Sequence, residues 1–484
     1  MATRSYARRP SLLGGVDRAS ALSVLTALVL AVLTGLATVK LGSFQHQLKA
    51  LLIVVAGVTA VVAALRPQIG LLILLAISPF ELAFYGTNSH EVMLVLLALV
   101  LAWRIDRRAI PAWVQFGGLT LIAGSFLAAL GAHSRSLALE GCVDWLCAIV
   151  VLFVAVSVLR EREDASRRMV GVVVGAAVIV VAFGFLQKAG IYAIVGEPFN
   201  TGLPNSFFSY YTVYAGYIAL AATIATAEIL IALEQHRIAR ACLFGAAVIF
   251  MIVGLVASTS RGGALALGVG WLMLVVLNTR RAPVIGRLLF VIAVFAVAAL
   301  AVTPRSTILT LEHRFAQSNG LLGEDRTRFA VQKAGEEALA NDPFGLGFGN
   351  FPFYVSSFVR NSRVRQPFFH AQETSVQVAL DSGWLGLAGF LTLVAGAIVL
   401  VLRRGGGGAS TVRASGFAAA LAGFMAQGLY DYVLWDVAFL VVFVALLWGI
   451  VHALGAEEPA SGSRRSTDTS SWRVSARTSS RPSG

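Results

Sequence analysis

Charged residues are scarce in this sequence, and that scarcity excludes whole classes of protein. Only 13% of the 484 residues are charged, whereas 57% are hydrophobic, and a soluble domain is about one quarter charged. A water-soluble enzyme of this length is therefore close to excluded, and so is a disordered chain. The three cysteines lie in or beside apolar runs, which indicates neither a disulfide framework nor a zinc site.

The few charges that are present are mostly positive. The net charge is +13 and the pI is about 10.2. In a soluble protein such a balance favours a nucleic-acid partner, whereas in a membrane protein it more often reflects arginines on the cytoplasmic side. The positions of the charges along the chain decide between these two interpretations.

Long apolar runs make up most of the chain. About 20 apolar residues are needed to cross the hydrocarbon core as a helix. Fourteen runs qualify as candidates, some of them short: 20–38, 50–65, 69–85, 91–104, 112–132, 141–159, 169–187, 212–233, 241–258, 263–278, 287–303, 375–402, 415–430 and 435–453. The sequence therefore predicts an all-α polytopic membrane protein with about 12–14 transmembrane helices.

The basic residues orient these spans. With the N-terminus placed in the cytoplasm, twenty arginines fall at cytoplasmic loops and span ends, against five basic residues in short outer loops. Because basic residues resist translocation, both termini are expected in the cytoplasm, and no nucleic acid is needed to explain the charge. No small-residue cleavage site closely follows the basic N-terminus, so the first apolar run is interpreted as an uncleaved span.

The predicted organisation follows from this topology. It comprises a cytoplasmic N-tail at 1–19, a transmembrane body at 20–303, a long outer loop at 304–374, C-terminal transmembrane helices at 375–453 and a disordered cytoplasmic tail at 454–484. The long loop carries eight basic and seven acidic residues, and long loops escape the rule that keeps basic residues inside. Function is expected on the outer face, where loop residues converge.

The long loop contains one predicted helix and a glycine-rich turn. The apolar spacing in residues 326–340 predicts a short helix that ends at Asp342-Pro343. The alternating glycines Gly345, Gly347 and Gly349 allow tight turns and a close backbone approach. A turn that links two amphipathic pieces is the simpler interpretation. No Gly-Lys-Ser/Thr follows, so nothing indicates ATP or a P-loop.

Three features of the outer face are candidates for function. Arg261 lies in a turn of small residues where basic residues are rare, and arginine can donate two parallel hydrogen bonds to phosphate. His370 precedes the span at 375–402 and has the side chain most suited to act as a base at neutral pH. Asp431 and Asp436 flank the last outer turn, where they either order arginines or cap helices. No Asp-x-Asp or His-Glu-x-x-His pattern lies in an outer loop, which disfavours a metal site.

The order of these motifs resembles a known family. Arg328, a helix and then Pro343-Phe344-Gly345-Leu346-Gly347-Phe348-Gly349-Asn350-Phe351 are similar to its pattern of arginine, helix and Pro-x-x-Gly-x-Gly-x-x-x-Phe. Ser260-Arg261-Gly262 resembles its Ser-Arg-Gly turn, and Gly383-Trp384-Leu385-Gly386 its Gly-x-x-Gly span entrance. This is the superfamily of O-antigen ligases and Wzy-type polysaccharide polymerases. The motifs cover residues 258–400, and the topology extends the resemblance to the whole chain.

The resemblance implies a membrane glycosyltransferase of the GT-C type in the bacterial inner membrane, inverting and independent of metals and cofactors. The donor would be an undecaprenyl-diphosphate-linked glycan, and the acceptor a sugar hydroxyl on another glycan or glycolipid at the outer leaflet of the bilayer. Carried onto this chain, Arg261, Arg328 and the nearby Arg326 would bind the diphosphate. His370 would activate or orient the acceptor hydroxyl.

One segment departs from the family pattern. The family's His-Asn pair falls on Gln372 and Glu373 here, whereas Gln377 occupies the family's glutamine position. Either His370 acts from two positions earlier, or Glu373 is the acid/base group. Two other functions also remain open at this stage: a transporter of an anionic solute or polysaccharide intermediate, and an inactive scaffold. Ligase and polymerase differ only in the acceptor.

Overall fold

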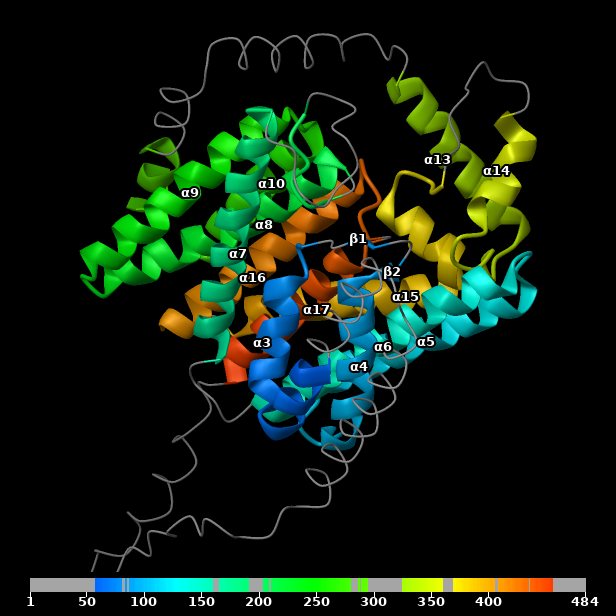
Figure 1. The fold of residues 1–484 in the computed structure, drawn as a ribbon, viewed down its shortest axis with the longest axis horizontal. Helices are drawn as coiled ribbons and strands as arrows, with labels where there is room; N and C mark the ends of the chain where they lie inside the picture. The colour runs from blue at the N-terminus through cyan, green and yellow to red at the C-terminus, as the bar shows by residue number, and fades with distance from the viewer. Residues whose placement is uncertain are drawn as a thin grey trace, which may run out of the picture.

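Helices form nearly all of the regular structure in the described part of the chain (Figure 1). The computed structural model describes residues 57–80, 83–84, 87–159, 165–190, 203–208, 210–279, 286–287, 289–294, 324–359, 369–404, 408–434 and 436–455. The helices are α3 (Pro67–Ile77), α4 (Ser89–Leu101), η1 (Ala102–Arg104), α5 (Ala112–Gly131), α6 (Arg135–Leu159), α7 (Ala165–Lys188), α8 (Tyr211–Glu234), α9 (Ile238–Ser258), α10 (Arg261–Leu277), α13 (Glu324–Asn341), α14 (Phe351–Val359), α15 (Thr374–Arg403), α16 (Ala409–Gly428) and α17 (Val437–Gly455).

Seven of the described helices are long and apolar enough to cross a membrane. They are α5, α6, α7, α8, α9, α15 and α17, and the shorter apolar helices α3 and α10 accompany them. The protein is thus an all-α polytopic membrane protein, as the apolar runs predict. The predicted span at 20–38, residues 50–56 of the span at 50–65 and most of the span at 287–303 lie outside the described residues.

The predicted span at 69–85 is wrong at its C-terminal end. Helix α3 stops at Ile77, and Pro79 comes after one further residue, Ser78, which still has helical angles of φ −51° and ψ −40°. Proline has no N–H to donate to the helix and its ring clashes with the preceding turn, a restriction that hydrophobicity does not report. The chain then forms a two-stranded antiparallel hairpin from β1 (Ala83–Phe84) and β2 (Thr87–Asn88) before α4 begins.

Two helices lie at the centre of the bundle. In both α8 and α17, 94% of the most apolar stretch is buried, whereas in α5, α9 and α15 less than half of it is buried. Helices α10 and α16 pack against α8, and α6 and α16 pack against α17. An all-round apolar helix is expected at a protein core, and the partly exposed helices are the ones available to lipid.

Helices α5 and α15 run side by side at the edge of the bundle (Figure 1). Small residues allow their backbones to touch, since a methyl group on Gly124 of α5 would overlap the backbone of α15 at Gly386. Such small-residue contacts are a common way for membrane helices to associate. The pair supports α13 and α14, of which α13 packs on α15 and α14 on α13.

The helix predicted at 326–340 is confirmed as α13. The glycine-rich segment after it is a turn, and Gly345, Gly347 and Gly349 all adopt positive φ values of 86°, 81° and 70°. A side chain on Gly345 would collide with the backbone of α15 at Gly383. The close backbone approach that these glycines permit is therefore, in this structure, an approach to α15.

Candidate active site

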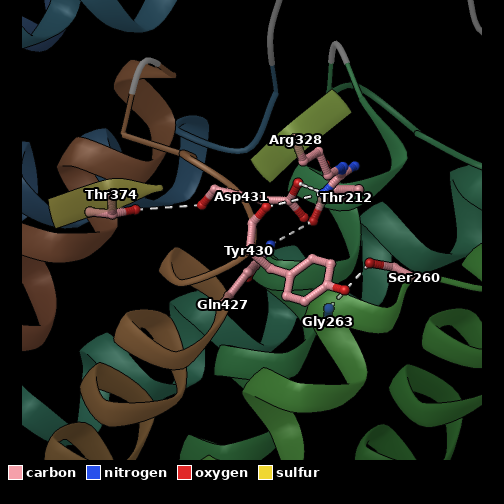
Figure 2. A network of polar contacts seen from close by, with 8 residues as sticks. All are labelled: Thr212, Ser260, Gly263, Arg328, Thr374, Gln427, Tyr430 and Asp431. Carbon is pink, nitrogen blue, oxygen red and sulfur yellow. Dashed lines mark hydrogen bonds and ion pairs between the residues drawn. The ribbon is translucent and has the colours of Figure 1, made fainter. Parts of the chain in front are cut away.

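The centre of the site is the short segment that follows α16. The backbone N–H groups of Tyr430 and Asp431 donate to the carbonyl oxygen of Gln427, at 2.8 and 2.9 Å. The side chain of Gln427 is itself held, because its Nε2 donates to the carbonyl oxygen of Thr212 in α8 at 2.9 Å. This turn fixes Tyr430 and Asp431 between α10, α13 and α15 (Figure 2).

Arg328 of α13 reaches this segment across 103 residues of sequence. Its Nη1 atom donates to Asp431 Oδ1 at 2.9 Å and to the carbonyl oxygen of Tyr430 at 3.1 Å (Figure 2). The guanidinium carbon also lies 5.8 Å from the centre of the Tyr430 ring, within the range of a cation–π contact. These contacts hold α13 over the end of α16.

Arg261 approaches the same tyrosine from α10. Ser260 caps that helix, and its Oγ accepts from the N–H of Gly263 at 3.1 Å. The guanidinium carbon of Arg261 lies 5.7 Å from the centre of the Tyr430 ring. Burial raises the pKa of Asp431, and Arg328 and Arg261 oppose that rise. Two guanidinium groups thus flank Tyr430 beside one carboxyl.

His370 contacts this segment through Tyr432. Its ring meets the ring of Tyr432 edge-on, with 5.6 Å between the ring centres. Burial disfavours the charged imidazolium, and the positive charge of Arg328 disfavours it further. Together they lower the pKa of His370 to about 4. The imidazole is consequently neutral at pH 7, which is the form that can accept a proton.

Glu373, the other candidate for the acid/base role, connects two helices. It precedes the first turn of α15. Its two carboxylate oxygens accept hydrogen bonds from Gln332 of α13 and, at 2.5 Å, from Ser375. Arg326 lies in the first turn of α13, and its side chain lies outside the described residues, so its role stays a prediction.

The two acids between α16 and α17 have different roles. Asp431 orders an arginine, as described above. Asp436 caps α17, because its Oδ1 accepts from the backbone N–H of Ala438 at 2.8 Å. Each of the two alternatives expected from the sequence therefore applies to one acid.

Two residues of the site, Tyr430 and Asp381, were not expected from the sequence, and a third, Gln377, was given no role. Tyr430 carries no signal of its own in a chain rich in aromatics. Asp381 does carry one, because a carboxylate inside an apolar span is costly and usually functional. It is buried, and its oxygens accept from Gln377 Nε2 at 2.7 Å and from the Tyr432 hydroxyl at 3.1 Å. Gln377 was noted only for its place in the family pattern.

Comparison with known proteins supports the resemblance seen in the sequence. No curated protein matches the chain. Residues 246–391 match the family model described as O-antigen ligase, and this segment contains Arg261, Arg328, His370 and Glu373. The match supports glycosyl transfer of the ligase or polymerase type. The resemblance expected from the motifs is thus confirmed over residues 246–391 of this membrane protein, the segment that matches the O-antigen ligase family model.

Proposed function

We propose that this protein transfers a glycan from an undecaprenyl-diphosphate carrier to a sugar hydroxyl at the outer leaflet of the bacterial inner membrane. The proposal places both termini in the cytoplasm and the Asp431 segment on the outer side. The observation that carries it is the convergence of Arg261, Arg328 and His370 on residues 430–432, inside the segment that matches the O-antigen ligase family.

In the proposed reaction the acceptor oxygen forms a bond to the anomeric carbon. The bond between that carbon and the diphosphate oxygen breaks, and its electron pair leaves with the diphosphate. Arg261 and Arg328 stabilise the charge that develops there, as fixed positive groups do in other transfer reactions. The proton of the hydroxyl passes to His370. A single displacement of this kind inverts the anomeric centre and needs no metal.

We assign the base role to His370 rather than Glu373. A base must be unprotonated and positioned beside the reacting hydroxyl. His370 is neutral at pH 7, because burial and the charge of Arg328 lower its pKa. Both oxygens of Glu373 accept hydrogen bonds from Gln332 and Ser375, which suits a structural role. Glu373 would then connect α13 to α15. Replacement of His370 by alanine should abolish transfer, and Glu373→Gln should retain most of it.

The test is transfer by the purified protein in proteoliposomes that contain a lipid-linked glycan donor and an acceptor. Arg261→Ala and Arg328→Ala should abolish transfer without changing the amount of folded protein in the membrane. Arg135→Ala is a matched control, because Arg135 is an exposed arginine at the start of α6. Full activity of both site variants would refute the proposal. Uptake of labelled donor by the vesicles would indicate a transporter instead.

The acceptor class follows from the glycans of a deletion strain. A ligase mutant should accumulate long carrier-linked chains, because only the final transfer is lost. A polymerase mutant should accumulate a single carrier-linked repeat unit. An unchanged glycan profile would argue against both versions of the proposed function.

A further inference from the structure

The carboxylate of Asp381 is connected to His370 by two separate routes. Asp381 projects from α15 and is only 3% exposed. On the first route its Oδ2 accepts from the hydroxyl of Tyr432, whose ring packs edge-on against the His370 ring. On the second route its Oδ1 accepts from Gln377 Nε2, and Gln377 Oε1 accepts from the backbone N–H of Ala371 at 2.6 Å. Both routes therefore end at the imidazole or at the residue after it.

A break in α15 holds Asp381 in place. In a regular helix the carbonyl oxygen of Leu380 would accept from the N–H of Trp384. Here Gly383 has φ 67° and ψ 178°, and the carbonyl of Leu380 accepts from the N–H groups of Leu346 and Gly347, at 2.6 and 3.1 Å. Trp384 donates to the carbonyl oxygen of Pro343 at 3.2 Å instead.

The glycine-rich turn therefore replaces the missing helical hydrogen bonds next to Asp381. This explains why the turn needs glycine at the point where it meets α15. A β-carbon on Gly345 would lie 2.6 Å from the backbone nitrogen of Gly383. The contact fixes the turn of α15 from which Asp381 and Gln377 reach toward the segments that carry Tyr432 and His370.

We propose that Asp381 is a positioning residue that sets the orientation of the His370 ring through Tyr432 and Gln377. This inference rests on the proposed function, in which His370 receives the proton of the acceptor hydroxyl. Asp381 itself is separated from the reacting groups by Tyr432. A carboxylate suits the position because it offers two acceptor oxygens to two donors that come from different elements. Loss of the carboxylate would remove the hydrogen-bond acceptor of both Tyr432 and Gln377.

Kinetics of substituted proteins test the proposal. Asp381→Ala should lower kcat about 100-fold with the KM for the carrier-linked donor unchanged, since small displacements of a reacting group have effects of this size. Asp381→Asn should recover activity to within about tenfold of the unaltered protein, because the amide keeps the shape and can still bond to both partners. Ser382→Ala is the control, since among the described residues the hydroxyl of buried Ser382 donates to the carbonyl oxygen of Val378 within α15.

The pattern among these variants decides between positioning and other roles. An Asp381→Asn variant as inactive as Asp381→Ala would show that the negative charge is required, and would overturn the proposal. Unchanged kcat in Asp381→Ala would overturn it as well. If Asp381→Ala fails to fold, Tyr432→Phe removes the hydroxyl while it keeps the ring. It should reduce kcat by a smaller factor without affecting donor KM, and an unaffected kcat would then overturn the proposal.

A second measurement does not depend on transfer activity. Carbethoxylation of His370 by diethyl pyrocarbonate, followed by mass spectrometry, reports how accessible the imidazole is. Its rate should rise several-fold in Asp381→Ala and less in Tyr432→Phe, and it should not change in Ser382→Ala. An unchanged rate in Asp381→Ala would refute positioning. If the unaltered protein transfers no glycan, the proposed function fails while this rate still decides the role of Asp381.

Discussion

Two clusters in this protein each place two arginines beside one carboxylate. They differ in how the arginines contact that carboxylate. In the Glu228 cluster, Arg240 of α9 and Arg413 of α16 both pair with Glu228 of α8. In the Asp431 cluster, Arg328 pairs with Asp431, whereas Arg261 faces the Tyr430 ring. Helix α9 spans 21 residues between them, or roughly 30 Å at 1.5 Å per residue, so the clusters lie near opposite ends of this helix.

Exposure separates the two clusters further. The Glu228 side chain is 0% exposed, and those of Arg240 and Arg413 are 17% and 11% exposed. Arg328 is 27% exposed. The Glu228 cluster therefore uses its charges to hold buried helices together, whereas the Asp431 cluster leaves the paired side chain of Arg328 partly exposed.

The largest effect is expected from Glu228→Ala. This change leaves two arginines in a buried place without their carboxylate. Removing one partner of a buried ion pair costs about 3–5 kcal/mol. The thermal unfolding temperature of the detergent-purified protein should fall steeply, and much more than in Asp431→Ala. Equal shifts in the two variants would contradict the distinction between the clusters.

A triple replacement provides the control for this prediction. Apolar side chains of similar size often substitute for a buried ion pair at little cost. Glu228→Leu combined with Arg240→Met and Arg413→Met should therefore recover most of the lost stability. A triple variant as unstable as Glu228→Ala would show that the charges do more than neutralise one another.

Asp431→Asn should affect transfer activity rather than stability. Hydrogen bonds to charged groups contribute about 1.5–3 kcal/mol, which corresponds to roughly 10- to 100-fold in rate when the loss falls on the transition state. Transfer activity should drop within that range because Arg328 loses its charged partner. The unfolding temperature should change little. Glu228→Gln is the matched variant, and it should lower stability more than the activity of each folded molecule.

The membrane architecture was largely predictable because hydrophobicity alone determines it. The run at 212–233 becomes α8, Tyr211–Glu234, and the run at 375–402 becomes α15, Thr374–Arg403. The break at Gly383 was not predictable, because it depends on hydrogen bonds from residues 343–347. The early end of α3 was visible in Pro79 but was outweighed by the apolar residues around it.

The site was predictable as a set of residues but not as an arrangement. Arg261, Arg328 and His370 stood out because each is a polar side chain in an unusual place. Their convergence on residues 430–432 could not be derived, since the contact from Arg328 to Asp431 spans 103 residues. Glu228 and Asp381 were available signals, because each is an acid inside an apolar run.

Gly262→Ala perturbs the Asp431 cluster more gently. A β-carbon on Gly262 would lie 2.9 Å from Asp431 Oδ2. The carboxylate is the mobile end of a side chain, so it should shift and weaken its contact with Arg328, which should lower transfer several-fold. Gly268→Ala on the same helix meets nothing within 4 Å among the described residues and should leave transfer unchanged. Equal activities of the two variants would contradict the proposed importance of the Asp431 contact.

The smallest effect is expected from mild acid, which acts on the Asp431 cluster through its neighbour His370. The pKa of His370 is lowered to about 4, so the ring should remain neutral as the pH falls from 7 to 5.5. His370 should therefore contribute less than a twofold change in kcat over that range, because the fraction of base stays near its maximum. A kcat that halves near pH 6.5, with a smaller decrease in Asp381→Ala, would show that the folded protein does not lower the pKa of this imidazole.

The titration of His370 can also be measured through the stability of the protein. The unfolded chain binds a proton at His370 below about pH 6.5, whereas the folded protein binds it only near pH 4. The unfolded state therefore binds more protons between these values, and the contribution of His370 to stability falls as the pH falls from 6.5 toward 4. The unfolding temperature should drop more over this range in the unaltered protein than in His370→Gln. An identical drop in both proteins would mean that His370 titrates alike in the folded and unfolded states, and that neither burial nor the charge of Arg328 lowers its pKa.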